Sequence, residues 1–324
     1  MTARPVGIGI LGATSFIARR AVVPAVGAAD GAAVVAVASR SSDVSDEWGA
    51  RAVPDYDDVI AHPDVEAVYL PLPNGMHAYW TERCAERGKH VLCEKPLARS
   101  ATEAASMASL CRSRGVLLAE AWMTPFDPRF ARVVELAREG AIGSLRRVEG
   151  TFTFTIGTDQ VDNYRWQPQQ GGGALADVGI YCLGAATELF GPDARVTTAT
   201  QVMTPSGVDA RTDAELRWPN GATAAVCTSF VDDEVQHLAI IGSQGELHLD
   251  GDAFTGGASA TDITDARGAT VESVRPDDCY RRMIEAFASA VRGTGEWPRP
   301  VERSVEMMTI IDEIGRAAGA PDAR

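Results

Sequence analysis

The chain has 324 residues, an ordinary apolar fraction of 45% and a formal net charge of −14, so it is long enough for two domains with a sizeable core. Its acidic residues are scattered, and such a surface repels the phosphates of nucleic acids and of anionic membranes, so we expect neither as a partner. No apolar run approaches the roughly 20 residues that a membrane span requires.

The first third of the chain alternates strand-like and helix-like segments. Apolar runs predict five strands at 6–11, 33–38, 65–70, 90–93 and 116–119. Helices are expected among them at 16–26, 76–87 and 101–114. Strands that alternate with helices form right-handed βαβ units around a parallel sheet. Residues 1–122 are therefore predicted to be a doubly wound α/β domain that binds a nucleotide.

Residues 123–324 are predicted to form an α+β domain with an open, mainly antiparallel sheet. Strand patterns with little helix among them occur at 144–156, 195–203, 210–218, 222–230, 236–241 and 246–249. Turn residues at 219–221 and 243–245 should join neighbouring strands as hairpins. Helices are expected at 129–138, 174–189, 278–291 and 302–317, and the last could pack back on the first domain. The small, polar segment 256–270 is expected to be a surface loop.

The first strand contains a decoy for the dinucleotide fingerprint. Gly7-x-Gly9-x-x-Gly12 matches the pattern letter by letter, but Gly7 and Gly9 lie inside the strand, too early to form the turn. We therefore place the phosphate-binding loop after the strand, with Gly12 as its first residue.

In this register the loop consists of Gly12 and the five residues that follow it. Gly12 makes the tight turn, and the free amides of the helix that begins at Phe16 and Ile17 face the pyrophosphate. Thr14 and Ser15 supply hydroxyl groups that can contact the cofactor or cap the helix. The alternative to a cofactor site is a purely structural turn.

The second strand ends in Ser39 and Arg40. A site selective for NAD usually has Asp or Glu here, to accept hydrogen bonds from the ribose 2′-hydroxyl. A carboxylate would repel the 2′-phosphate of NADP, whereas a guanidinium and a hydroxyl can bind it. We therefore expect NADP(H) rather than NAD(H). The alternative is an arginine that is merely solvated.

The cysteine and histidine pattern argues against disulfides and against a metal. Six cysteines are spread without close pairs, and no Cys-x-x-Cys or His-x-x-x-His spacing occurs. The apolar stretch after Arg4 could pass for a signal peptide, but a strand that runs into a helix explains it better. We therefore expect reduced thiols, a cytoplasmic protein and no metal site.

Two further motifs follow the third and fourth predicted strands. Pro73-Asn74-Gly75-Met76-His77 opens a helix, with Asn74 suited to cap it. Glu94-Lys95-Pro96 places two opposite charges where a buried strand ends. Any strand that reaches the surface meets charged residues, but strand ends in α/β sheets are also where ligands bind.

These motifs resemble those of the glucose-fructose oxidoreductase / inositol dehydrogenase / MocA (Gfo/Idh/MocA) family. The resemblance covers nearly the whole chain and includes the run Gly171-Gly172-Gly173-Ala174-Leu175-Ala176-Asp177-Val178-Gly179-Ile180-Tyr181. It implies a Rossmann domain and a substrate domain whose open sheet mediates a homodimer or homotetramer. It also implies hydride transfer between a nicotinamide and a carbon bearing a hydroxyl or carbonyl, usually on a sugar or cyclic polyol.

The resemblance also implies roles for individual residues. Lys95 matches the catalytic lysine of the family, and Glu94 lies beside it at the nicotinamide end of the cofactor. Pro73, Asn74 and His77 match residues that line the cofactor cleft.

Tyr181 stands where many members of the family carry histidine. Asp177 and Tyr181 are four residues apart, so on a helix they share one face and are candidates for catalysis and for substrate binding. A phenol near the Lys95 ammonium has its pKa lowered, so Tyr181 could transfer the proton that accompanies the hydride. Tyrosine here is similar to the branch with aldose dehydrogenases, dihydrodiol dehydrogenase and ketosugar reductases. The alternative is a tyrosine that only packs behind the helix.

Two more residues are candidates for contact with substrate. Arg165, in Tyr164-Arg165-Trp166, occupies a place that resembles the substrate-proximal loop of aldose dehydrogenases. It could bind hydroxyls or a phosphate, or it could form a structural ion pair. Trp122, after the fifth strand, is expected to reach the cleft at the domain junction.

These observations favour an NADP(H)-dependent oxidoreductase that acts on a sugar or related cyclic alcohol. The alternative enzyme is a reductase of a nucleotide-linked ketosugar in a deoxysugar pathway. A regulator that binds the cofactor without catalysis is disfavoured, because Lys95, Asp177 and Tyr181 are all retained.

Overall fold

The computed structural model describes residues 4–40, 49–157, 160, 162–256 and 262–319. The chain forms two compact units, each assembled from segments that are distant in sequence. Unit 1 consists of Met1–Ala98, Thr102–Trp122 and Tyr280–Val305. Unit 2 consists of Arg99–Ala101, Met123–Cys279 and Glu306–Arg324. Among the described residues, no helix combines the length and the apolar character needed to cross a membrane.

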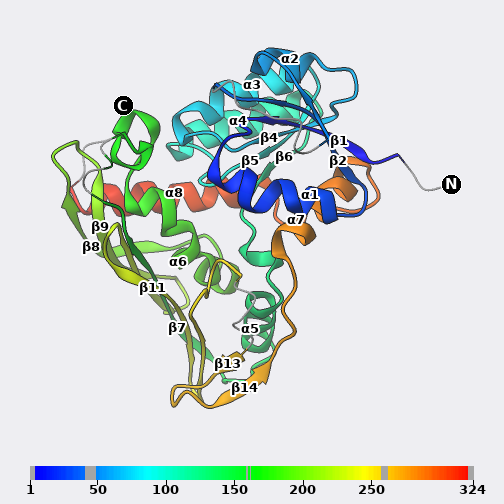
Figure 1. The fold of residues 1–324 in the computed structure, drawn as a ribbon. Helices are drawn as coiled ribbons and strands as arrows, with labels where there is room; N and C mark the ends of the chain where they lie inside the picture. Colours follow the sequence, from blue (N-terminus) through cyan, green and yellow to red (C-terminus); the bar gives the residue numbers. More distant parts are fainter. Residues whose placement is uncertain (1–3, 41–48, 158–159, 161, 257–261, 320–324) are drawn as a thin grey trace. The chain divides into compact units, whose positions relative to one another are not determined.

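Unit 1 contains the predicted parallel sheet (Figure 1), with six strands in the order β3-β2-β1-β4-β5-β6. They are β1 (Val6–Leu11), β2 (Ala32–Ala38), β3 (Arg51–Ala52), β4 (Ala67–Leu70), β5 (His90–Cys93) and β6 (Leu118–Glu120). All neighbouring strands pair in parallel. Sheets of this kind are buried on both faces, so their strands are continuously apolar, which is the pattern that predicted them. The two-residue strand β3 was not predicted, because an exposed Arg-Ala pair carries no such pattern.

Helices accompany the strands of unit 1. They are α1 (Val23–Ala28), which continues a π-helical turn (Ala18–Val22), α2 (Tyr56–Ala61), α3 (His77–Glu86), α4 (Ala101–Ser113) and α7 (Cys279–Val291). The division into units falls within α8 (Val301–Ala317), after Val305. The prediction missed α2, because six residues are too few to show a helical period; its capping residue Asp55 accepts a hydrogen bond from the Asp58 amide at 2.9 Å.

The strand order reverses at β1, whose neighbours are β2 and β4. In sheets of this kind, ligands bind beyond the carboxyl ends of the strands at such a switch point. The candidate cofactor residues all follow strands: the Gly12 loop follows β1, Ser39 follows β2, Pro73 follows β4 and Glu94 follows β5. The topology therefore gathers residues from four segments of the sequence at one edge of the sheet.

Gly7 and Gly9, which match the dinucleotide fingerprint without forming its turn, allow close packing on β1. Gly7 and Gly9 lie within β1, as predicted. A Cβ on Gly7 would overlap the Asp64 carbonyl oxygen, and one on Gly9 would lie 2.5 Å from a methyl of Val59. Glycine at these positions allows α2 and the segment after it to approach the strand closely.

Unit 2 contains an open sheet of eight strands in the order β14-β13-β12-β11-β7-β10-β9-β8. They are β7 (Leu145–Thr155), β8 (Arg195–Met203), β9 (Asp209–Arg217), β10 (Thr223–Ser229), β11 (Val231–Gly242), β12 (Glu246–Asp250), β13 (Asp262–Thr264) and β14 (Thr270–Ser273). Every neighbouring pair is antiparallel except β7 and β10. The predicted hairpins join β9 to β10 and β11 to β12.

The prediction of a surface loop over 256–270 was wrong in part. Strands β13 and β14 extend the sheet from β12, and residues 257–261 lie outside the described residues. Both strands are short and polar, and only Ile263 among their side chains is fully buried, so the sequence carried no alternating signal.

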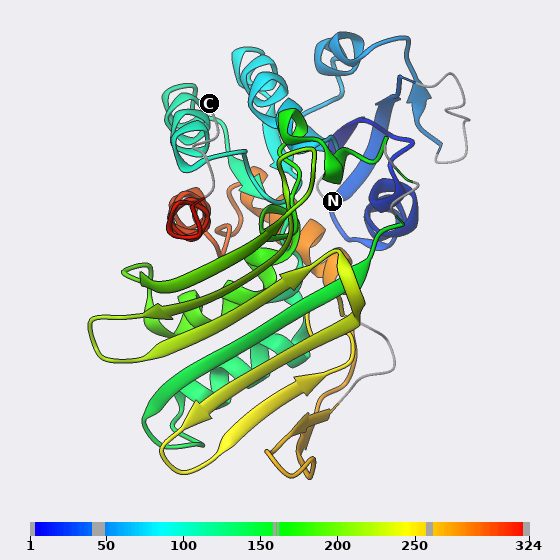
Figure 2. The same ribbon diagram turned by 90° about the vertical axis from the view of Figure 1, so that its left-hand side faces the viewer.

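Helices α5 (Pro128–Arg138) and α6 (Ala174–Phe190) belong to unit 2, and α6 packs on β7, β9 and β10. Figure 2 shows the sheet with these helices behind one face. The approach of α6 to the sheet is close, since a Cβ on Gly150 of β7 would lie 2.6 Å from the Cα of Cys182. Side chains on the opposite face are only half-buried, which gives β9 and β10 their alternation.

Candidate active site

The loop after β1 requires glycine for two independent reasons. Gly12 has φ of +95°, a conformation that strains any residue with a side chain. A Cβ here would also lie 2.9 Å from Leu72 Cδ2 and 3.2 Å from the Pro71 carbonyl. The amides of Gly12 and Ala13 both donate to the Ala38 carbonyl, at 2.9 and 3.1 Å, and this ties the loop to the end of β2. The backbone thus forms a cradle that a side chain would fill.

The helix after this loop presents its first turn at the end of β1. The Ser15 hydroxyl accepts the Ala18 amide at 3.1 Å, so Ser15 caps the helix as predicted. Phe16 and Ile17 stand in the first turn, where helical geometry provides no backbone acceptor for the amides. The Phe16 side chain is 79% exposed and Ile17 is half-buried. Such a helix start can hold a pyrophosphate.

Two hydroxyls join the ends of β1 and β2. The Oγ1 atom of Thr14 and the Oγ atom of Ser39 lie 2.5 Å apart. Arg40 is exposed, and its charge partly offsets the rise that burial causes in the pKa of Tyr56, which places the guanidinium near that phenol. Residues 39 and 40 thus offer a hydroxyl and a positive charge, and no carboxylate, to a cofactor ribose.

The structure gives His77 and Asn74 roles that differ from those expected. His77 is fully buried, and its Nε2 and Nδ1 atoms lie 2.9 Å from the Leu72 carbonyl and 3.1 Å from the Pro96 carbonyl. Burial lowers the pKa of His77, despite these carbonyl contacts. The imidazole therefore links the loops after β4 and β5 and has no exposed surface for a cofactor. Asn74 caps no helix: it is buried inside a 3₁₀ turn, Asn74–Met76, whose capping position is Pro73.

The Glu94-Lys95-Pro96 motif leaves β5 as a buried turn from which Lys95 is partly exposed. Glu94 is 8% exposed and accepts a hydrogen bond from the Tyr69 hydroxyl at 2.6 Å. Its second oxygen accepts the Lys95 amide at 3.3 Å. Burial, reinforced by the Glu94 charge, raises the pKa of Tyr69, so this phenol stays protonated as a donor. Glu94 thus holds the backbone that carries Lys95.

In unit 2, α6 begins without a capping side chain of its own. Its capping residue is Gly173, with φ of +115°. Asp209 of β9 takes over that function: its Oδ2 accepts the Leu175 amide at 2.8 Å and the Thr212 hydroxyl at 2.8 Å. A Cβ on Gly173 would overlap Oδ1 of Asp209. Glycine is therefore required so that a carboxylate from a distant strand can reach the helix end.

The same glycine run holds the turn that carries Arg165. A Cβ on Gly172 would overlap the Arg165 carbonyl, which accepts the Gly173 amide at 2.9 Å. The Nε atom of Arg165 lies 2.7 Å from Oδ2 of Asp177, which is 4% exposed. Burial, the largest single effect, lowers the pKa of Arg165, but the Asp177 charge, the Tyr164 phenol and the hydrogen bond to Asp177 together outweigh it and raise the pKa. Of the alternatives for Arg165, the structure shows the ion pair.

Tyr181 lies one turn beyond Asp177 on α6 and is 5% exposed. Its ring is 5.2 Å from that of Phe152 and 6.1 Å from that of Phe254, measured between centroids. Its hydroxyl donates to the Met123 sulfur at 3.9 Å. A thioether is a weak hydrogen-bond acceptor.

Trp122 is buried. It is 1% exposed and belongs to unit 1, where the guanidinium of Arg299 lies 4.8 Å from its ring centroid. Its contact with substrate stays a prediction.

Two family models match the chain. The model described as "Oxidoreductase family, NAD-binding Rossmann fold" matches residues 6–121, and the "GFO/IDH/MocA C-terminal domain" matches residues 130–248. The chain belongs to the Gfo/Idh/MocA family of oxidoreductases. The resemblance inferred from the motifs is therefore confirmed, as are the Rossmann sheet and the largely antiparallel second sheet.

Individual relatives are similar over nearly their full length. D-xylose 1-dehydrogenase (NADP(+)) 2 of Haloferax volcanii is 41% identical over 96% of both chains. The dTDP-3,4-didehydro-2,6-dideoxy-alpha-D-glucose 3-reductase of Streptomyces violaceoruber is 36% identical over 91% of this chain and 88% of that protein. A crystal structure of a 3-ketoreductase from Actinomadura kijaniata, in complex with NADP and TDP-benzene, superposes with a TM-score of 0.89 at 31% identity, over 97% of this chain and 98% of that chain.

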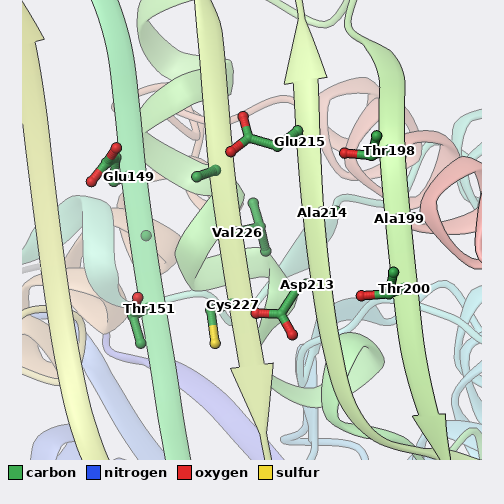
Figure 3. Close-up of a pocket in the computed structure, with 12 residues that line it drawn as sticks. Glu149, Thr151, Thr198, Ala199, Thr200, Asp213, Ala214, Glu215, Val226 and Cys227 are labelled. Atoms are coloured by element: carbon green, nitrogen blue, oxygen red, sulfur yellow. The ribbon is translucent and has the colours of Figure 1, made fainter.

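A hollow in unit 2 of this Gfo/Idh/MocA protein is lined by neither Asp177 nor Tyr181. It measures about 280 Å³ and lies on the outer face of the sheet, between side chains of β7, β8, β9 and β10 (Figure 3). Among them are Glu149, Thr200, Asp213 and Cys227. Asp177 and Tyr181 are on α6, which packs on the opposite face. This hollow therefore does not contain the candidate catalytic residues of α6.

Three residues that hold the site in place were missed by the sequence analysis. Asp209 caps α6, and Glu120 and Arg299 meet in the core of unit 1 at 3.0 Å. Asp209 lies 34 positions from Leu175, and Glu120 lies 179 positions from Arg299, so no local motif could have indicated these pairs. In the sequence, the only indication of Asp209 and Glu120 was an isolated acidic residue at the start or end of a predicted strand.

Proposed function

We propose that this member of the Gfo/Idh/MocA family is an NADP(H)-dependent oxidoreductase that transfers a hydride between the nicotinamide and a hydroxyl or carbonyl carbon of a sugar or related cyclic alcohol. The observation that carries the proposal is the retention of Lys95 on the β5 turn together with Asp177 and Tyr181 on α6 in one chain of this family. A regulator without catalysis would have no need of all three groups.

The cofactor-binding residues are those at the ends of the parallel strands. Gly12, Ser15, Phe16 and Ile17 supply the cradle and the amides for the pyrophosphate, and Thr14 with Ser39 supplies hydroxyls. Arg40 accounts for a preference for NADP(H), since a guanidinium can pair with a 2′-phosphate. The relative from Haloferax volcanii carries NADP(+) in its name, and the similar ketoreductase structure contains NADP, which supports this preference.

We assign distinct roles to Lys95 and Tyr181. The nicotinamide, when bound, accepts or supplies the hydride. Lys95 holds the reacting oxygen by a charge-assisted hydrogen bond, and Tyr181 takes the hydroxyl proton during oxidation or returns it during reduction. The loss of proton and hydride converts the hydroxyl carbon to a carbonyl, so the two events balance.

Asp177 contributes by orientation rather than by proton transfer. One of its oxygens is engaged by Arg165 at 2.7 Å, and the guanidinium stabilises the carboxylate charge. A buried carboxylate in this state can accept a hydrogen bond from a substrate hydroxyl, which fixes the ring relative to Tyr181.

The same ion pair bears on the class of substrate. Because Arg165 is bound to Asp177, it is not a ready anchor for the phosphates of a nucleotide-linked sugar. This favours a free sugar, as does the higher identity to the xylose dehydrogenase than to the ketosugar reductase. The reductase activity remains the second candidate, supported by the structural similarity to the 3-ketoreductase.

A substrate panel tests the proposal. NADP+ reduction is measured with aldoses, polyols and dihydrodiols, and NADPH oxidation with nucleotide-linked ketosugars, each followed by nicotinamide absorbance. We expect turnover with a free aldose and a loss of that turnover in Lys95→Met. Turnover confined to nucleotide-linked ketosugars would support the second candidate. Tight binding of NADPH without turnover of any compound would support a regulator.

We also propose that the protein forms a homo-oligomer through the outer face of the unit 2 sheet. This face carries charges of both signs: Arg147 pairs with Glu149 and Glu215, and Arg211 pairs with Asp213 and Asp232. Two copies related by a two-fold axis could exchange such pairs, because the surface carries both signs in rows. Sedimentation equilibrium tests it: Ala225→Arg, which puts a long charged side chain in the middle of this face, should yield monomers. A mass that is unchanged by this substitution would contradict the proposal.

A compartment that keeps thiols reduced fits the cysteines, since all six are free in the structure.

A further inference from the structure

A buried charged network lies directly behind the turn that carries Lys95. It consists of Glu120 at the end of β6, Arg299 before α8 and Ser304 in the first turn of α8. Their exposed fractions are 4%, 9% and 1%. Charged side chains are rarely buried to this degree unless they are paired and serve a specific arrangement. The network therefore calls for an explanation beyond ordinary packing.

The two oxygens of Glu120 face different parts of unit 1. Oε2 accepts hydrogen bonds from Arg299 Nη1 at 3.0 Å and from the Ser304 hydroxyl at 2.6 Å. Oε1 accepts the backbone amide of Leu97 at 2.9 Å. The guanidinium of Arg299 also lies over the Trp122 ring and donates to the Arg303 carbonyl at 3.3 Å. Glu120 thus bridges the C-terminal segment of unit 1 and the residue two positions after Lys95.

The other contacts of this turn show why the Leu97 amide matters. His77 faces the Pro96 carbonyl at 3.1 Å, and Glu94 accepts the Lys95 amide at 3.3 Å. These contacts thus hold the backbone on both sides of Lys95, and Glu120 provides the one at Leu97. A side chain of four rotatable bonds can place its ammonium reproducibly only if the backbone beneath it does not move.

We propose that Glu120, held by Arg299 and Ser304, is a positioning residue for Lys95, an inference that rests on the proposed catalytic role of that lysine. Arg299 and Ser304 fix one oxygen of Glu120, so the other oxygen stays in place to accept the Leu97 amide. The C-terminal segment 280–305 is then part of the catalytic machinery of unit 1. It fixes the position of Lys95 without contact to substrate or cofactor.

The test compares two double variants that both remove the buried charges. Glu120→Gln with Arg299→Met keeps an oxygen acceptor for the Leu97 amide. Glu120→Leu with Arg299→Met has a similar volume and no acceptor. Neither leaves an unpaired charge in the core, so both are expected to fold. Arg292→Met is the matched control, because Arg292 makes a comparable long-range pair with Glu66 in unit 1 away from the turn.

We expect kcat of the Leu/Met protein to fall roughly 10–100-fold below that of the Gln/Met protein, because small displacements of a catalytic group have effects of this size. The dissociation constant of NADPH, measured by its fluorescence, should be similar in the two. Hydrogen exchange of the peptide that covers residues 94–98, measured without ligands, should be faster only in the Leu/Met protein. The Arg292→Met control should leave kcat and exchange of this peptide unchanged.

Equal kcat and equal exchange in the two double variants would overturn the proposal. If the Leu/Met protein does not fold, Arg299→Lys decides the question, since it keeps the charge and loses the forked geometry. Faster exchange at 94–98 and a lower kcat in that variant support positioning, and wild-type values for both refute it. Lys95→Met separates this inference from the proposed function: full activity in that variant removes the role of Lys95, while the exchange results still report on the network.

Discussion

The two halves of the candidate site are built in opposite ways. In unit 1, the residues proposed to bind the cofactor follow β1, β2, β4 and β5 directly in the chain, and the parallel topology brings those strand ends together. In unit 2, Asp177 and Tyr181 occupy successive turns of one helix. The start of that helix is set by Asp209, which lies 34 positions beyond Leu175.

This difference determines what each half tolerates. The candidate cofactor residues of unit 1 are spread over several strand ends. Each substitution there should remove one contact with the cofactor and leave the other contacts in place. A substrate half on one helix moves as a body if its first turn shifts, so remote changes reach Asp177 and Tyr181 together. Four predictions test this comparison.

The largest expected effect joins the two halves. Lys95→Met and Tyr181→Phe should each lower kcat about 10²–10⁴-fold, the usual contribution of a positioned acid–base group. Because both act on one proton transfer, the double variant should lose far less than the product of the single losses. Steady-state kinetics of the three proteins measure this. Near-full kcat in Tyr181→Phe would make Tyr181 a packing residue and direct attention to Asp177 or a water held by Lys95.

Arg165→Met should affect the substrate half alone. It leaves Asp177 buried without its partner, and breaking a fully buried pair costs roughly 3–5 kcal/mol. The loss should be smaller here, because the Arg165 side chain is 29% exposed. Urea unfolding measures it, and KM for substrate should rise while NADPH affinity stays constant. Arg165→Lys is the control that keeps the charge, and equal stability of the Met and Lys proteins would contradict the structural pair.

Arg40→Ala should affect the cofactor half alone. NADP(H) binding should weaken by about 1.5–3 kcal/mol, the range for hydrogen bonds to charged groups, and NAD(H) binding should hardly change. Fluorescence titration with both cofactors measures the difference. Arg114→Ala, which removes an exposed charge at the end of α4, is the matched control. Equal loss for both cofactors would mean that the specificity determinant lies elsewhere.

The smallest effect concerns the cap of α6. Burial raises the pKa of Asp209 above its ordinary 3.8, although hydrogen bonds from Leu175 and Thr212 oppose the rise. The folded protein therefore binds this proton more tightly than the unfolded chain does. The stability that this proton binding contributes is present below pH 3.8 and is lost as the pH rises through the folded-state pKa.

Asp209→Asn removes this titration and keeps a side-chain oxygen as an acceptor at the start of α6. Complete loss of a helix cap costs about 0.5–2 kcal/mol. The stability of the wild type relative to Asp209→Asn should therefore decline as the pH rises above 3.8, in urea unfolding at a series of pH values. A difference that is constant with pH would show that the Asp209 pKa is the same in both states.

The local part of the fold followed from pattern. The strand β1 was predicted at its observed bounds, and Gly12 was separated from Gly7 and Gly9 because a turn cannot lie inside a strand. The Ser15 cap and the two hairpins of unit 2 followed from the same short-range rules, in which a few neighbouring residues determine the backbone.

The burial of individual residues could not be predicted from local pattern. His77 was predicted to line the cofactor cleft and Trp122 to contact substrate, and both are buried in unit 1. A polar or aromatic residue near a motif looks functional in sequence, because its burial depends on segments that are distant in the chain. The glycine triplet was recognised as a motif, but its reason became clear only when Arg165 and Asp209 were seen to occupy the space that side chains would fill.

By itself the sequence determined the family, the two kinds of sheet, the glycine turn after β1 and the identity of Lys95, Asp177 and Tyr181 as chemical groups. These depend on local backbone preferences and on residue type, which act over a few positions of the chain. The tertiary structure alone decided what holds those groups: Glu120 and Arg299 behind the lysine turn, Asp209 at the start of α6, and Arg165 on Asp177. Charges buried in a core need partners, and in a folded chain the partner is chosen by proximity in space rather than by order in the sequence.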